Sequence, residues 1–252
     1  MLNKFKSSLN NIDYILYFAL LVLGLAPTVY TTVRVFFLGV MPGEWSFSIA
    51  GQLSWVNLLY EIINEAIILP LYFFMGKVIT EKIEYENRIR TGLIISFCVY
   101  AVFSVLICAF TEPLLSVMAT SKDIINESVA YIRIESFANI FILLSNFLLV
   151  CLVTLGKSKY VYFLTFAKLI LSILFDTFFV STLNISANLG VNGIGYSNII
   201  VNIILFAISV VLLSKEKINV FRKEKLSFSW AKDFIKIGGI SGFESFVRNL
   251  AY

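Results

Sequence analysis

The chain has 252 residues and a formal net charge of +4, and 59% of its residues are hydrophobic while only 14% are charged. Its mean hydropathy is +0.87. This composition lies outside the range of soluble globular proteins and indicates an integral membrane protein, for which we expect the lipid bilayer as a partner and no nucleic acid. Histidine is absent, which removes histidine-dependent catalysis and the commonest metal ligand.

Apolar stretches long enough to cross the hydrocarbon core of a bilayer recur along the whole chain. They cover 12–39, 47–76, 91–112, 128–155, 160–183 and 193–213, and a seventh begins near Phe234. The pattern predicts an all-α integral membrane fold, with a six-helix transmembrane lobe in 1–213 and a cytoplasmic linker in 214–233. Residues 234–252 then begin a second lobe, and we expect either further spans after them or a partner chain that supplies the missing lobe.

Basic residues are concentrated in the connections on one side of these spans. Only Lys122, or Lys122 and Arg133, would lie in the connections on the other side. Lysine and arginine are enriched in cytoplasmic loops, so we predict a multi-pass protein with a cytoplasmic N-terminus. The predicted cytoplasmic residues are Lys4, Lys6, Lys77, Lys82, Arg88, Arg90, Lys157, Lys159, Lys215, Lys217, Arg222, Lys223, Lys225 and Lys232.

The second span carries Asn57, Glu61, Asn64 and Glu65 on one predicted helical face. If the insertion cost of glutamate is taken to equal that of aspartate, two acids at the centre of a span together cost about 5 to 7 kcal/mol of insertion free energy. This cost nearly cancels the gain from the apolar residues of the span. We therefore expect this face to meet a protein interior or an aqueous cavity rather than lipid.

Three polar residues of other spans lie at one predicted depth. Counting about 1.5 Å per residue from the outer ends of the helices places Arg34 and Asn198 about 7 Å deep and Asp176 about 10 Å deep. This common level predicts an ion pair between Arg34 and Asp176. An alternative is that Arg34 snorkels to the outer interface.

A second level lies nearer the cytoplasm. The same count places Lys168 about 22 Å and Glu61 about 21 Å from the outer end, with Glu65 one turn deeper. This level predicts an ion pair of Lys168 with Glu61 or Glu65. Such charges either hold helices together passively or mark a path for ions, protons or substrate, and the sequence leaves both interpretations open.

Two further segments suggest alternatives. Residues Leu114–Ile134 mix apolar and charged residues, as in an amphipathic segment at the outer interface or a solvated loop. Residues Gly239–Gly242 form a GxSG sequence that resembles the serine motif of a protease, but this chain contains no histidine to act as the base. Phosphate-loop and HExxH motifs are also absent, so we expect no catalytic residue, no metal site and no enzymatic activity.

Several stretches together resemble the multidrug and toxic compound extrusion (MATE) family of secondary transporters. Thr32–Gly39, TVRVFFLG, is similar to the VDTxFVG signature of the family's first helix, and Lys236–Glu244, KIGGISGFE, is similar to the KxGxPSxxE that opens its second lobe. The stretches between them, in order, are PLLSVMATSKDIINESVAYIRI at 113–134, GKSK at 156–159, SILFDTFFV at 172–180 and LGVNGIGYSN at 189–198.

The resemblance implies a two-lobe, alternating-access transporter in a bacterial plasma membrane that exports small organic compounds, often cationic, against an inward flow of Na⁺ or H⁺. No cofactor other than that coupling ion is implied. The family's cation site in the N-terminal lobe maps onto Asp176, Ser172 and Asn198, but its first-helix aspartate falls on Arg34. A guanidinium at that position would neutralise Asp176 and fill the site.

This departure leads to two functional hypotheses. In the first, Glu61 and Glu65 carry the coupling and Lys168 tunes them, with Asn57 and Glu244 beside the substrate cavity. In the second, the chain is a flippase for lipid-linked polysaccharides, since members of that branch of the superfamily carry more basic residues in their lobes.

Overall fold

The computed structural model describes residues 14–40, 46–117 and 122–250, and all regular secondary structure in these ranges is helical. The helices are α2 (Tyr14–Val40), α3 (Ser46–Gly76), α4 (Lys82–Val117), α5 (Ile125–Thr154), α6 (Ser158–Phe179), α7 (Asn192–Lys215) and α8 (Ala231–Leu250). Five of them, α3 to α7, are long and apolar enough to cross a membrane. The predicted all-α membrane fold is therefore confirmed.

Most helix boundaries agree with the predicted spans, with three differences. Helix α4 begins at Lys82 rather than at residue 91, because its polar first turns bind the segment that precedes α8. Helix α6 ends at Phe179, and the chain then turns back to α7. The predicted interfacial segment is not a separate element, since α4 continues through Pro113 to Val117 and α5 begins at Ile125. Residues 118–121 of that segment lie outside the described ranges.

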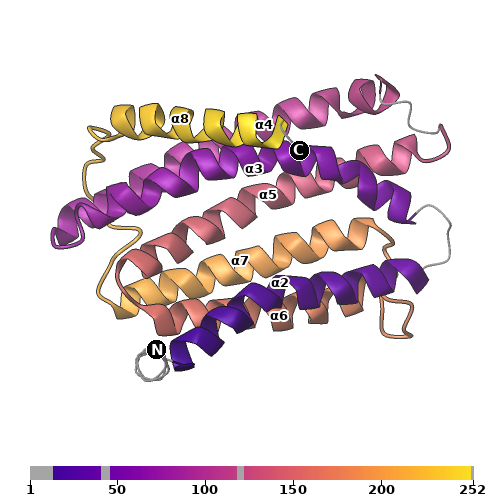
Figure 1. Ribbon diagram of the computed structural model, residues 1–252, viewed down its shortest axis with the longest axis horizontal. Coiled ribbons are helices and arrows are strands. Elements are labelled where there is room, and N and C mark those ends of the chain that lie inside the picture. The colour runs from indigo at the N-terminus through magenta and orange to yellow at the C-terminus, as the bar shows by residue number, and fades with distance from the viewer. Residues whose placement is uncertain (1–13, 41–45, 118–121, 251–252) are drawn as a thin grey trace, which may run out of the picture.

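Successive helices run in opposite directions, and their polar connections gather at one end. Figure 1 shows the start of α2 and the α3–α4, α5–α6 and α7–α8 connections at the same end of the bundle. Every basic residue predicted to be cytoplasmic, except Lys4 and Lys6, lies in or next to these connections. Those two lysines fall outside the described residues. The sidedness of the membrane itself stays a prediction.

The helices form two groups that meet along α5 and α7. One group contains α3, α4, α5 and α8, and the other contains α2, α6 and α7 (Figure 1). Within the first group, α8 packs on α3 through glycines. A Cβ atom on Gly238 would lie 2.5 Å from the carbonyl oxygen of Ala66, and one on Gly242 would lie 3.0 Å from the Ala66 Cβ. Small residues four apart allow such close packing of membrane helices, which gives the glycines of this segment a structural role.

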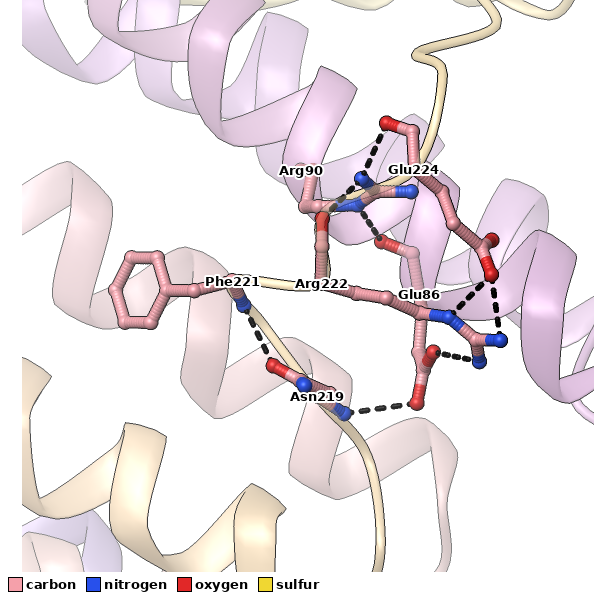
Figure 2. A network of polar contacts seen from close by, with 6 residues as sticks. All are labelled: Glu86, Arg90, Asn219, Phe221, Arg222 and Glu224. Carbon is pink, nitrogen blue, oxygen red and sulfur yellow. Dashed lines mark hydrogen bonds and ion pairs between the residues drawn. The ribbon is translucent and has the colours of Figure 1, made fainter.

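A hydrogen-bonded clamp fixes the connection between α7 and α8 to the first turns of α4 (Figure 2). The buried carboxylate of Glu86 accepts the backbone N–H of Asn219 at 2.8 Å and Nη1 of Arg222 at 2.9 Å. Arg90 donates to the carbonyl oxygens of Arg222 and Glu224. These bonds satisfy backbone groups of a segment that has no regular structure of its own.

Two further contacts extend the clamp toward α8. The side-chain amide of Asn87 exchanges two hydrogen bonds with the backbone of Ser227, and the indole N–H of Trp230 donates to Thr91 at 3.0 Å. The clamp therefore determines where α8 starts along α3 and α4. The predicted linker is an ordered element in this structure, whereas its role between two lobes stays a prediction.

Candidate functional site

The centre of the site is an ion pair between α2 and α6. Arg34 donates from Nε to Asp176 Oδ2 at 2.8 Å and from Nη2 to Asp176 Oδ1 at 3.1 Å. Nη2 also donates to the side-chain oxygen of Asn198, on α7, at 3.0 Å. The side chain of Asp176 is 1% exposed and that of Arg34 is 16% exposed. The pairing predicted from the common depth is confirmed, and Arg34 does not snorkel.

A second carboxylate, which the sequence reasoning missed, completes this set. Asn198 Nδ2 donates to Oε1 of Glu135, on α5, at 2.8 Å, and Glu135 is 3% exposed. Glu135 follows the predicted start of its span by seven residues, which corresponds to a depth of about 10 Å, the level of Asp176. The depth count would have found it, had Glu135 been included among the ionisable residues inside the spans. We call Arg34, Glu135, Asp176 and Asn198 the Arg34 cluster.

The Arg34 cluster joins four helices and contains more acidic side chains than basic ones. One guanidinium faces two carboxylates, and only that of Asp176 bonds it directly. Taking ionised groups out of water is costly unless partners compensate them. Arg34 bonds Asp176 and Asn198 but not Glu135, whose hydrogen-bond partners are the amide of Asn198 and the side chain of Tyr131.

Hydrogen bonds continue from the cluster along α7. Asn202 Nδ2 donates to the carbonyl oxygen of Asn198 at 2.8 Å, and Ser145 Oγ, on α5, donates to Asn202 Oδ1 at 2.8 Å. Ser172 is buried on α6, one turn before Asp176. Of the three polar positions mapped from the family resemblance, Asp176 and Ser172 are buried and Asn198 is half-buried, and all three lie at or beside the cluster.

Lys168 lies in a different environment from the one predicted. It forms no hydrogen bond or ion pair within the described residues, and the predicted pairing with Glu61 or Glu65 is wrong. The reason is that α6 packs against α2, α5 and α7, whereas the acids belong to α3. Lys168 instead lines a cavity of about 310 Å³, together with Pro27, Tyr30, Ser145, Asn146, Leu149, Leu164, Thr165, Leu205 and Ser209.

The acids of α3 lie on the side of the bundle where α8 packs. Glu65 is half-buried and forms an ion pair with Arg248 of α8. Glu61, one turn earlier, is exposed and forms no hydrogen bond or ion pair among the described residues, and Asn57 and Glu244 are also exposed. We call Asn57, Glu61, Glu65, Glu244 and Arg248 the α3–α8 face.

No group of three or more cysteine, aspartate or glutamate side chains in the described ranges has a geometry that could hold a metal ion.

Comparisons with known proteins show which family model and which solved structures this chain resembles. Residues 82–178 match the family model MatE. A search of curated proteins found no match. Solved structures, in contrast, match nearly the whole chain, although their sequences are only 15–16% identical to it.

Three of these structures illustrate the likeness, each with a TM-score of 0.79, 15% identity and coverage of 93% of this chain. One is a MATE in complex with MaD3S, of which 53% is covered. The second is the outward-facing conformation of a multidrug resistance MATE family transporter of the MOP superfamily, of which 52% is covered. The third is a MOP superfamily transporter from Pyrococcus furiosus Vc1, described by the reverse polarity of its binding pocket, of which 52% is also covered.

The chain spans about half the length of these solved transporters. Its identity to them is low, so the structural likeness establishes the fold, and the family model adds the segment from α4 to α6. The two findings confirm the resemblance that the sequence motifs predicted: this chain carries a MatE segment within the fold of a MATE transporter.

Proposed function

We propose that this protein takes part in secondary active transport, exporting organic compounds by alternating access against an inward flow of Na⁺ or H⁺ across a bacterial plasma membrane. The observation that supports this most directly is the Arg34 cluster, which is buried at the junction of four helices and connected by hydrogen bonds to a cavity. Charged groups at membrane depth are costly, and they usually mark the paths of ions, protons or substrates. The MATE fold supports a transporter rather than an enzyme.

The composition of the cluster favours Glu135 as the group that exchanges a proton. Arg34 occupies Asp176 with two hydrogen bonds, so that carboxylate is neutralised in place. The bonded partners of Glu135 are neutral groups, the amide of Asn198 and the hydroxyl of Tyr131. Its protonation would remove a negative charge from the cluster and change the balance between the conformations that α2, α5, α6 and α7 can adopt.

The α3–α8 face offers a second set of acids for the same role. Glu61 is exposed and unpaired in the described structure, and Glu65 has Arg248 as a partner that it would release on protonation. Coupling through Glu61 and Glu65 therefore remains a proposal, now without a contribution from Lys168.

Transport by the complete gene product tests both sets of acids. It should be reconstituted in liposomes with an imposed pH or sodium gradient, and the efflux of fluorescent organic cations and anions should be followed. We expect Glu135→Gln to abolish the dependence on the gradient, whereas Glu127→Gln, in the exposed first turn of the same helix, should leave it unchanged.

Gradient-dependent efflux that survives in Glu135→Gln would remove Glu135 from the coupling. Efflux that also survives in Glu61→Gln and Glu65→Gln would remove the acids of the α3–α8 face. If the unmodified protein shows no efflux of any organic compound, the transport proposal itself fails.

The second candidate function is a flippase for lipid-linked polysaccharides. It is favoured by the two basic side chains inside the bundle, Arg34 and Lys168, and by the likeness to a transporter whose binding pocket is described as reversed in polarity. Rescue of a glycan-export defect by the complete gene, without any gain of drug resistance, would favour this function over drug export.

A further inference from the structure

We propose that the cavity beside Lys168 binds an anionic group of the transported compound. The inference rests on the proposed transport function, because it names the chemical class of the substrate. It starts from an ammonium group inside a membrane-spanning helix that has no counter-ion in the described structure. Such a group is costly to maintain, and an anion that enters the cavity would compensate its charge.

The buried acids that could have paired with Lys168 form hydrogen bonds with other residues. Asp176, on the same helix, is bound by Arg34 through both of its oxygens, and Glu135 accepts a hydrogen bond from Asn198. No described carboxylate lies within 4 Å of the Lys168 amino group. The cavity therefore presents a positive charge that the protein itself does not neutralise.

The lining of the cavity indicates the rest of the ligand. Leu149, Leu164 and Leu205 supply apolar surface, and hydroxyl and amide groups stand among them. The volume of about 310 Å³ is at the lower limit of typical ligand pockets. An organic anion with a compact apolar body, such as an aryl sulfonate or the end of an amphiphilic phosphate, fits this combination of size, charge and polarity.

The cavity is also connected to the Arg34 cluster. Ser145 lines the cavity and donates to Asn202, which in turn donates to the carbonyl oxygen of Asn198. Tyr30, another lining residue, precedes Arg34 by one turn of α2. An anion beside Lys168 would therefore lie one hydrogen-bonded chain away from the groups that we propose to exchange protons.

Binding of two matched aromatic probes tests the inference without any transport measurement. The complete protein in lipid nanodiscs should be titrated calorimetrically with naphthalene-1-sulfonate and with 1-naphthylmethylammonium, after subtraction of the heats from empty nanodiscs. We expect the sulfonate to bind at least tenfold more tightly than the ammonium. Lys168→Met should weaken sulfonate binding at least tenfold, Lys168→Arg should retain it, and Lys159→Met, in the exposed first turn of α6, should leave it unchanged.

Equal affinities for the two probes, or sulfonate binding that is unchanged in Lys168→Met, would overturn the inference. If Lys168→Met does not elute as a folded protein, Lys168→Gln replaces it, since glutamine keeps the polarity and most of the length of the side chain. Sulfonate binding that depends on Lys168 in a protein that transports nothing would uphold the binding site and refute the transport function. Efflux of organic compounds without any sulfonate binding would uphold the transport function and refute the anion site.

Discussion

The Arg34 cluster and the α3–α8 face are built around the same chemical pair, an arginine beside a carboxylate, in opposite surroundings. In the cluster the side chains of Arg34 and Asp176 are 16% and 1% exposed. On the face those of Arg248 and Glu65 are 48% and 21% exposed. The cluster is enclosed by four helices, whereas the face is bounded by α3 and α8 alone.

This difference determines what each pair can do. Breaking a buried ion pair leaves a charge without compensation and is strongly destabilising, while an exposed pair contributes little to stability and exchanges partners readily. We therefore infer that the Arg34–Asp176 pair holds α2 and α6 in place, and that the α3–α8 face is the more adaptable of the two regions.

The largest effect is expected for Arg34→Ala. It would leave the carboxylates of Asp176 and Glu135 buried without a cation, at a cost of about 3 to 5 kcal/mol of stability. The measurement is the fraction of the complete protein that remains monodisperse in size-exclusion chromatography after heating.

Reversal of the pair provides the control for this prediction. Arg34→Asp and Asp176→Arg should each reduce expression of folded protein, and the double variant should recover it. If the double variant expresses no better than the single variants, the ion pair is not a structural link between α2 and α6.

A smaller effect is expected for Gly238→Val, which acts on the packing of α8 against α3. A Cβ atom at this position would lie 2.5 Å from the carbonyl oxygen of Ala66, and overpacking of this kind costs about 1 to 3 kcal/mol. The same heating assay should show this loss, and the Arg34 cluster should be unaffected because α8 does not contribute to it.

Gly239→Val is the matched control, since a Cβ atom on Gly239 meets nothing within 4 Å. Equal losses in the two variants would show that intrinsic helix propensity, rather than the contact with Ala66, accounts for the effect.

Much of the fold could be predicted from the sequence because most of the helices contain a predominantly apolar run of membrane length. The depth count also succeeded for Arg34, Asp176 and Asn198, since a regular helix converts sequence position directly into height. It failed for Lys168 and Glu61 because height does not specify direction around a helix axis. Glu65 lies on the side of α3 that packs against α8, while Lys168 faces the cavity between α2, α5 and α7.

Direction around a helix axis depends on which helices pack together, and the sequence carries that information only weakly. The close packing of α8 on α3 depends on Gly238 and Gly242, and nothing in the local sequence, where Gly242 ends the GxSG stretch, indicates that contact. The clamp of Glu86 and Arg222 likewise joins residues far apart in the chain, and no local pattern marks them as partners.

The smallest effect is expected for Arg248→Ala. Its guanidinium is about half exposed, and pairs of this kind contribute roughly 0 to 1 kcal/mol, so the heating assay should show a shift much smaller than that of Arg34→Ala. The two arginine variants measured side by side compare the regions directly, because each removes the cation of one arginine–carboxylate pair. A loss in Arg248→Ala as large as that in Arg34→Ala would contradict the comparison, since it would show that the α3–α8 face is enclosed in the complete protein and that Glu65 depends on Arg248 as strongly as Asp176 depends on Arg34.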